Sequence, residues 1–450
     1  MITCRLGIES NLTDLMFELI KRLAFFLLNV IVKFLLKRGI IFSRYYSAFG
    51  HQAWNLEHYS RSYQQIYGRS PKIISFQRSN FIPNRAMYQR HKEQGVLIFG
   101  SNSVLTKIFI AARTRYTEFQ TPQNILSSPC QSLTYCRYSM DDIHVGTFVN
   151  EEASIAFPFS PLEERKSLPI LKEYGLTKYQ YVCFHDRSIQ YKKRAPLEHQ
   201  SQLRILRNNK FAKAQDTTHP AGESSKEWWF EVFKENRHDY ARNTSLSYLY
   251  QAANFLHEQQ IESIRVGKHP EQPAKPGTLI DYATLSNSDH GFSDLALFNY
   301  CKFFVGPNSG LWLLARSLNK PVCLINAFPW PWINVPFPSN SMVMPKKLWH
   351  VEDKKFLTIY DMAEMENRFH WKSFKRDEFY DQIKLEIIEN SAEEIRYAVE
   401  EMNSRLDGDQ SYPEYRVSKF LESYNIAKET NALFPSFFVE ENPDIFPQSK

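Results

Sequence analysis

Short apolar runs alternate with helical stripes through the second half of the chain. The helical pattern is clearest over Ser245–Gln260, where apolar residues recur every three or four positions. Runs short enough to be buried strands lie on either side of it, at Tyr181–His185, Ser263–Gly267, Thr278–Asp281 and Phe303–Val305. Strands that alternate with helices at this spacing predict a doubly wound α/β domain with a parallel sheet.

The best defined unit of this pattern is residues 301–326, where a strand, a tight loop, a helix and a second strand follow one another. We expect Asn308 or Ser309 to cap the helix, because short polar side chains accept hydrogen bonds from the first N–H groups. Gly310 would let a ligand approach the backbone closely. A helix start below a polar loop suits a phosphate group, although an ordinary strand–helix turn without a ligand explains the same pattern.

The pattern is weaker in the N-terminal half of the chain. Ile73–Phe76 and Val96–Phe99 have the composition of strands, and the segment from Phe49 is typical of a loop that opens a helix. We assign residues 43–165 to a first α/β domain. Within it His51 is a candidate base, because a histidine that faces a cleft can accept a proton near neutral pH. Simple packing in a core or at the surface is the alternative for this histidine.

Residues 1–42 form a hydrophobic leader. Its apolar run, Leu23–Leu36, lies between the basic pairs 21–22 and 37–38 and is shorter than the roughly 20 residues that cross a bilayer. A helix in the plane of an anionic membrane surface fits these features, and a buried first helix fits them equally well. We expect a cytoplasmic protein, with a peripheral position at the inner face of the membrane as the open question.

Composition narrows the class of protein. A net charge of +6 over 450 residues permits anionic ligands but does not indicate a nucleic-acid partner. The six cysteines include no CxxC pair, so we predict a reducing compartment and no structural zinc. The chain lacks the GxxxxGK[ST] motif of P-loop ATPases and the GxGxxG motif of dinucleotide enzymes.

Three cationic side chains fall at predicted strand ends. Arg187 follows the strand at 181–185, and Arg265 and Lys268 lie at the end of the next strand, beside Gly267. In an open parallel sheet the carboxyl ends of the strands share one edge, where ligands bind. These cations and the helix start could together neutralise a diphosphate. Any one of them alone would be an ordinary salt-bridge partner.

Several short motifs, taken in order, resemble a bacterial glycosyltransferase family with a GT-B-like fold, in which two Rossmann-like domains face each other across a cleft. They are GHQAWNLEHY at 50–59, HDR at 185–187, RN at 242–243, IRVGK at 264–268, DYA at 281–283, SD at 293–294 and CKFFVGPNSG at 301–310. The HDR motif is also similar to the His-x-Arg element of fucosyltransferases, whose arginine holds the donor's diphosphate. The sequence departs from the family at Lys268 and His269, where acidic or small residues are more usual.

The resemblance implies a domain order and a set of site residues. The N-terminal domain at 43–165 would supply the acceptor site. A C-terminal domain that binds the nucleotide-sugar would span 179–406, with a polar insertion at 190–240, and we expect a polar tail at 407–450 to wrap the surface. The resemblance implies that His51 and Arg187 are catalytic. The donor-binding residues that it implies are His185, Arg187, Arg265, Gly267, Lys268, Asp294, Asn308, Ser309 and Gly310.

The implied reaction moves a sugar from a nucleotide-sugar to a cell-surface glycan or its lipid-linked precursor. Cationic residues would stabilise the leaving nucleoside diphosphate, so we expect no metal and no cofactor. Two other readings stay open: a non-catalytic nucleotide-binding module docked at the membrane, and a nucleotide-sugar epimerase on the same fold.

Overall fold

The computed structural model describes most of the two predicted domains. The described residues are 34–35, 38–45, 49–77, 82–108, 155–188, 241–268, 270–284, 290–329, 337–368, 380, 382–422 and 430–447. Most of the predicted leader at 1–42 and all of the predicted insertion at 190–240 lie outside these residues. Within them, no helix is long and apolar enough to cross a membrane.

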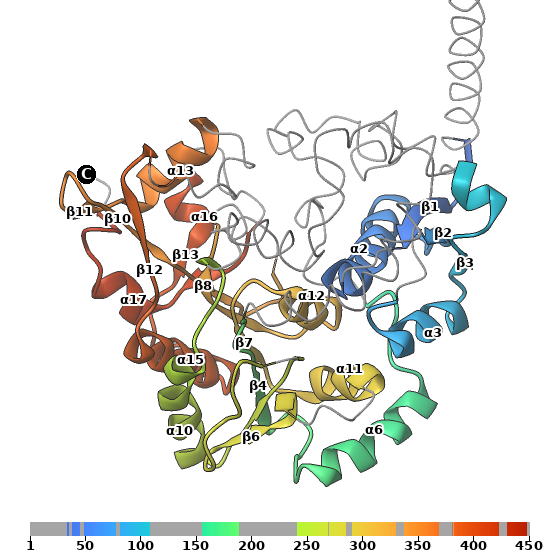
Figure 1. The fold of residues 1–450 in the computed structure, drawn as a ribbon, viewed down its shortest axis with the longest axis horizontal. Helices are drawn as coiled ribbons and strands as arrows, with labels where there is room; N and C mark the ends of the chain where they lie inside the picture. The colour runs from blue at the N-terminus through green and yellow to red at the C-terminus, as the bar shows by residue number, and fades with distance from the viewer. Residues whose placement is uncertain are drawn as a thin grey trace, which may run out of the picture.

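A small parallel sheet forms the N-terminal part of the described chain (Figure 1). Its strands, in spatial order, are β1 (Ile40–Tyr45), β2 (Lys72–Gln77) and β3 (Leu97–Phe99). Two helices follow the first two strands, α2 (Phe49–Tyr67) and α3 (Arg85–Glu93). Leu56 on α2 packs with Tyr45 and Ile73 in a small core between helix and sheet. The two strands predicted in this half are confirmed.

An eight-stranded sheet forms the larger part of the molecule. Its order is β13-β14-β9-β8-β7-β4-β5-β6, and of the strand pairs described in this sheet only β13–β14 is antiparallel. The strands are β4 (Tyr181–Phe184), β5 (Glu262–Arg265), β6 (Leu279–Asp281), β7 (Phe304–Gly306), β8 (Val322–Ala327), β9 (Met342–Pro345), β13 (Tyr415–Arg416) and β14 (Leu433–Phe434). Every residue of β4, β7, β8 and β9 is buried, as expected of a parallel sheet covered on both faces.

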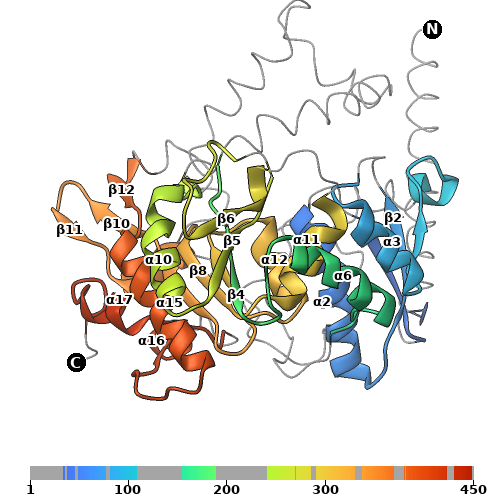
Figure 2. The ribbon, with the colours of Figure 1, turned by 90° about the horizontal axis from the view of Figure 1, so that it is seen from below.

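Helices pack on both faces of this sheet. In Figures 1 and 2 the pair α10 and α15 lies on one side of the central strands, and the pair α11 and α12 lies on the other side, toward α2, α3 and α6. The helices outside the N-terminal part are α6 (Pro161–Glu173), η3 (Leu246–Leu249), α10 (Tyr250–Glu258), η4 (Tyr282–Thr284), α11 (His290–Tyr300), α12 (Gly310–Ser317), α13 (Ile359–Arg368), α15 (Ala392–Leu406), α16 (Val417–Phe420) and α17 (Ser436–Glu440). A separate antiparallel sheet consists of β10 (Lys347–His350), β11 (Lys355–Phe356) and β12 (Leu385–Ile388).

Helix starts follow the sequence signals in some places and not in others. The sequence Ser391-Ala392-Glu393-Glu394 is typical of a capping box. The structure confirms it, since Ser391 Oγ accepts from Glu394 N (3.1 Å) and Glu394 Oε2 accepts from Ser391 N (2.7 Å). Ser293 precedes an apolar run and has the residue type of a cap, but α11 begins at His290, so Ser293 lies in its first turn. His51 lies inside α2, although a loop was the expectation there.

The prediction of a polar surface tail at 407–450 is wrong for the described part of that segment. β14 pairs with β9 and extends the main sheet. Phe434, Phe438 and Phe446 are buried, and the rings of Phe434 and Phe446 lie 5.0 Å apart. Scattered aromatic residues do not show helical or strand periodicity in the sequence, but here they pack together against the sheet.

Helices α2 and α12 lie side by side and run parallel. At their first turns Gly50 meets Gly310: a Cβ added to Gly310 would lie 2.9 Å from the Gly50 N atom, and one added to Gly50 would lie 2.8 Å from the Gly310 Cα. The φ angle of Gly310 is outside the left-handed region, so contact rather than backbone conformation requires glycine. The side of Gly310 where a Cβ would stand therefore faces α2. The sequence suggested instead that a ligand approaches the backbone there.

A buried ion pair fixes the other end of this helix pair. Arg61 on α2 donates to Glu57 Oε1 (2.6 Å) and, through Nη2, to the carbonyl oxygen of Ser317, the last residue of α12 (2.8 Å). Glu57 also accepts from the backbone N–H groups of Ala156 and Phe157, just before α6. α2 is thus held against α12 at Gly50 and, about three turns further along, at Arg61.

We expect Gly50→Ala and Gly310→Ala each to lower the free energy of unfolding by about 1–3 kcal/mol, because a methyl group must push two helix backbones apart. Gly100→Ala is the matched control: its added Cβ meets no atom within 4 Å, and its effect should stay within about 0.5 kcal/mol. Urea unfolding without ligand measures all three variants. Equal stability of Gly310→Ala and Gly100→Ala would contradict the close contact.

Candidate functional site

The strand order places a ligand site between β4 and β7. From β4 the chain proceeds through β5 and β6 to one side, and then through β7, β8 and β9 to the other side. Connections that diverge from two adjacent parallel strands leave a crevice at their carboxyl ends, which is where ligands bind in such sheets. The segments that follow β4 and β7 here are His185–Arg187 and Pro307–Ser309.

The loop after β7 is anchored at Asn308 and capped at Ser309. Ser309 Oγ accepts from Leu311 N (3.2 Å), which confirms Ser309 as the cap of α12. Asn308 has no exposed surface, and its Oδ1 accepts from Phe328 N (2.7 Å) beyond the end of β8. Its Nδ2 group is buried and has no hydrogen-bond partner among the described residues. A buried donor without an acceptor costs free energy, and a bound ligand could supply the missing acceptor.

Arg242 lies against the same loop. Its Nη2 donates to Asn308 O (2.7 Å), while its buried Nε has no acceptor within the described part of the chain. Burial lowers the pKa of Arg242 well below its usual range, and the charge of Arg187 lowers this pKa further. Two guanidinium groups that repel each other beside a helix N-terminus form a strongly positive site.

Arg187 and Lys346 extend this positive region around Asn243. Arg187 Nη1 donates to Asn243 Oδ1 (3.3 Å), and burial lowers the pKa of Arg187 to about 10. Lys346, just after β9, donates to Asn243 O and to Glu389 Oε1, both at 2.9 Å. Burial lowers the pKa of Lys346, Glu389 acts in the opposite direction, and Arg187 lowers it further. We call Arg187, Arg242, Lys346 and Asn308 the cationic cluster.

His185 joins three strands at the edge of this cluster. Its backbone N donates to Val305 O (2.9 Å) and its Nδ1 lies 3.0 Å from Val266 O. Because a carbonyl oxygen accepts, Nδ1 carries the proton. A Cβ on Gly267 would lie 3.0 Å from His185 Nδ1, and one on Gly306 would lie 3.1 Å from His185 Cβ. Burial is the main cause that lowers the pKa of His185 to about 4, so the ring is neutral at physiological pH.

The guanidinium group of Arg265 is paired with acceptors within the fold. It has no exposed surface, and its Nε and Nη2 donate to the two carboxylate oxygens of Asp186 (2.6 and 2.7 Å). Its Nη1 donates to Gln272 O (2.8 Å) and reaches the Asp281 carboxylate at 3.3 Å. With all three nitrogens paired, Arg265 ties the ends of β4, β5 and β6 together. The structure therefore favours a structural role for it over phosphate binding.

The remaining predicted donor residues are placed differently. Asp294 is buried on α11 and accepts from the Tyr282 hydroxyl (3.1 Å), so it lies in the core beneath η4. Lys268 is exposed in the loop that follows β5. The backbone of His51 follows Gly50 in the first turn of α2, beside the start of α12, but its side chain lies outside the described atoms. His51 therefore stays a prediction with a favourable backbone position.

Two members of the cationic cluster were missed as site residues. Arg242 belongs to the RN pair that carries the resemblance, but it does not follow a predicted strand. Lys346 follows β9, which the pattern of the sequence does not predict. Their convergence with Arg187 is visible only in three dimensions.

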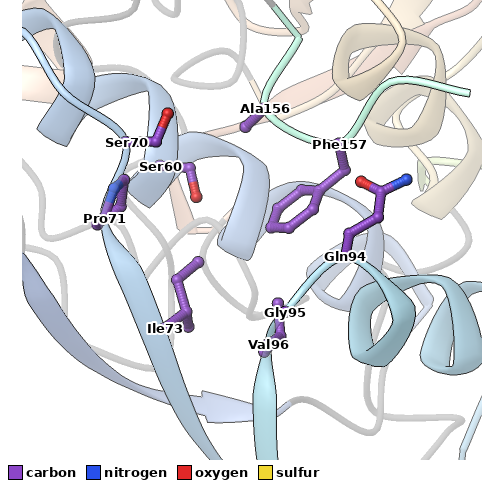
Figure 3. A pocket seen from close by; sticks show the side chains of 9 residues that line it. All are labelled: Ser60, Ser70, Pro71, Ile73, Gln94, Gly95, Val96, Ala156 and Phe157. Carbon is purple, nitrogen blue, oxygen red and sulfur yellow. The ribbon is translucent and has the colours of Figure 1, made fainter.

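A cavity of about 100 Å³ lies on the N-terminal sheet (Figure 3). Its lining comes from α2, the amino ends of β2 and β3, and the segment before α6: Ser60, Ser70, Pro71, Ile73, Gln94, Gly95, Val96, Ala156 and Phe157. That volume is enough for about three water molecules and is well below the 300 Å³ of a small ligand pocket. It also lies at the amino ends of strands, so we do not assign the active site to it.

Comparisons with known proteins do not assign this chain to a family. No family model matches the chain, and no curated protein matches it significantly. Among solved structures, the glycosyl transferase family 9 protein from Veillonella parvula DSM 2008 is similar over 81% of this chain and 97% of its own, at 9% identity and a TM-score of 0.37. A TM-score this low does not establish a common fold.

Among the described residues, no group of three His, Cys, Asp or Glu side chains gathers as a metal ligand set.

Because the half-buried His185 has a lowered pKa in the folded state, acid should destabilise the protein through it. The unfolded state, with a histidine pKa of about 6.5, binds a proton before the folded state does, so stability falls as the pH falls from about 6.5 toward 4. Between pH 6 and 5 we expect the wild type to lose about 1.4 kcal/mol more per pH unit than His185→Asn. Urea unfolding of both proteins at several pH values tests this. Parallel pH dependences would show that the pKa of His185 is not lowered in the folded state.

Proposed function

We propose that the protein is a glycosyltransferase that uses a nucleotide-sugar donor. The observation that carries the proposal is the pair of buried donors without acceptors, Arg242 Nε and Asn308 Nδ2, beside the start of α12. The sequence motifs that resemble bacterial glycosyltransferases contribute both residues and Arg187. The resemblance and the geometry therefore point to the same edge of the sheet.

A diphosphate fits this cluster better than a neutral ligand does. Phosphate oxygens accept several hydrogen bonds at once, so one diphosphate could satisfy both buried donors. Its negative charge would offset the repulsion between Arg187 and Arg242 and the cost of burying them. The positive end of the α12 dipole adds to the attraction. A neutral sugar alone would leave that charge uncompensated.

In the proposed reaction, the bond between the sugar C1 and the diphosphate oxygen breaks, and the diphosphate takes the electron pair. An acceptor hydroxyl oxygen forms the new bond to C1, and its proton goes to a base, for which His51 is our candidate. The cationic cluster stabilises the charge that develops on the leaving diphosphate. The proposed reaction requires no metal and no cofactor. A cell-surface glycan or its lipid-linked precursor is the proposed acceptor.

Arg242→Gln should weaken binding of nucleoside diphosphates about ten- to a hundredfold, because a charge-assisted bond to phosphate contributes roughly 1.5–3 kcal/mol. Arg165→Gln on the exposed face of α6 is the control and should bind as the wild type does. Calorimetry with a panel of nucleoside diphosphates and nucleotide-sugars provides the affinities. Unchanged affinity of a folded Arg242→Gln variant would move the phosphate site elsewhere.

Product analysis with the nucleotide-sugar that binds then separates the open alternatives. Transfer to an added acceptor supports a glycosyltransferase. Conversion to an isomeric nucleotide-sugar without an acceptor supports an epimerase, and binding without turnover supports a non-catalytic module.

The leader at 1–42 is proposed to hold the protein at a membrane surface without crossing it. Deleting residues 1–40 should release the protein to the soluble fraction, and high salt should weaken the association of the full chain, because its basic flanks act through screened charge. Fractionation of cells that express either form measures this. Resistance of the full chain to carbonate extraction would contradict a surface location.

A further inference from the structure

Helix α2 carries two buried amide side chains in opposite situations. Gln52 is fully bonded: its Nε2 donates to Tyr45 Oη (2.9 Å) and Asn84 O (2.8 Å), and its Oε1 accepts from Asn84 N (3.0 Å). Asn55 has no exposed surface, yet neither its Oδ1 nor its Nδ2 has a hydrogen-bond partner among the described residues. One unbonded buried amide leaves both a donor and an acceptor unsatisfied, which is a large cost for a structural residue.

The helical register sets Asn55 apart from the two packed faces of α2. Gly50, Trp54 and Arg61 face α12. Leu56 and Tyr63 face the sheet, in the cores that contain β1. At 100° per residue, Asn55 lies on the face between these two, and His51, four residues earlier, shares that face. Asn55 is also five residues from Gly50, or about 7.5 Å along the helix from the contact with α12.

We infer that Asn55 forms the acceptor subsite of the proposed glycosyltransferase and binds hydroxyl groups of a polyhydroxylated acceptor. This inference rests on the proposed function. A pair of neighbouring sugar hydroxyls both donates and accepts hydrogen bonds, so it can satisfy Oδ1 and Nδ2 together. A second phosphate or a carboxylate would only accept and would leave Oδ1 unsatisfied. The amide therefore selects a neutral hydroxylated group.

The location suits an acceptor. The cationic cluster lies next to the α12 start, and Gly50 touches that start. A separation of about 7.5 Å along α2 leaves room for one sugar ring between the diphosphate and a hydroxyl held at Asn55. His51 lies between them by register. Since Asn55 has no exposed surface in this structure, the inference requires that an acceptor displaces the side chains that cover this face of α2.

The test compares Asn55→Leu with the matched variant Gln52→Leu. Replacing an unbonded buried amide by an apolar group of similar size should raise the melting temperature by about 2–4 °C, whereas Gln52→Leu breaks three hydrogen bonds and should lower it. Asn55→Leu should keep the affinity for the nucleoside diphosphate, because the cationic cluster is intact. A variant that melts lower, as Gln52→Leu does, would show that Asn55 is structural and would overturn the inference.

The second readout is release of nucleoside diphosphate from the nucleotide-sugar, with a panel of methyl glycosides as acceptor probes. We expect at least one glycoside to stimulate release by the wild type, and Asn55→Leu to lose about tenfold or more of this stimulation, since two hydrogen bonds are lost. Stimulation of Asn55→Leu equal to that of the wild type, or no stimulation of the wild type by any glycoside, would overturn the inference. Failure of every nucleotide-sugar to bind would instead refute the proposed function itself.

Discussion

The contact between Gly50 and Gly310 is the constraint on which the site depends. Because neither residue has a side chain, the first turns of α2 and α12 come close enough for backbone atoms to touch. Each helix begins at the carboxyl edge of its own sheet, after β1 and after β7. Their parallel alignment therefore brings both edges, and two helix N-termini, to the same side of the molecule. Arg61 and Glu57 hold this alignment at the far end of the pair.

Two arginines near this edge, the buried Arg265 and the half-buried Arg242, differ in how completely the fold pairs their nitrogen atoms. Arg265 has a carboxylate on each neighbouring strand and donates with all three nitrogens, so its charge is neutralised within the fold. Arg242 is bonded to a carbonyl oxygen, lies near Arg187, and keeps a buried donor without an acceptor. The first arrangement stabilises three strand ends. The second costs free energy in the absence of a ligand, and a bound diphosphate would recover it.

The same contrast holds for amides. Gln52 is paired within the N-terminal domain, and Asn84, which caps α3, continues the network through Nδ2 to Gly291 O on α11. Asn55, less than one turn further along α2, is not part of any such network among the described residues. Buried polar groups without a hydrogen-bond partner among the described residues thus occur on α2 as well as beside the start of α12.

The sequence by itself determined the local elements, because hydrophobic periodicity, caps and glycine act within a few residues. The strands β4 to β8, the cap at Ser309, the capping box at Ser391 and the burial of Cys183, Cys301 and Cys323 could all be predicted. The sequence also indicated an anionic site at the carboxyl edge, through Arg187 and Asn308. Only the tertiary structure decided which cations gather there: Arg265 is neutralised by Asp186 and Asp281, while Arg242 and Lys346 converge on Arg187. Such pairings join residues that lie far apart in sequence, so local periodicity carries no information about them. The contact of Gly50 with Gly310 was beyond prediction for the same reason.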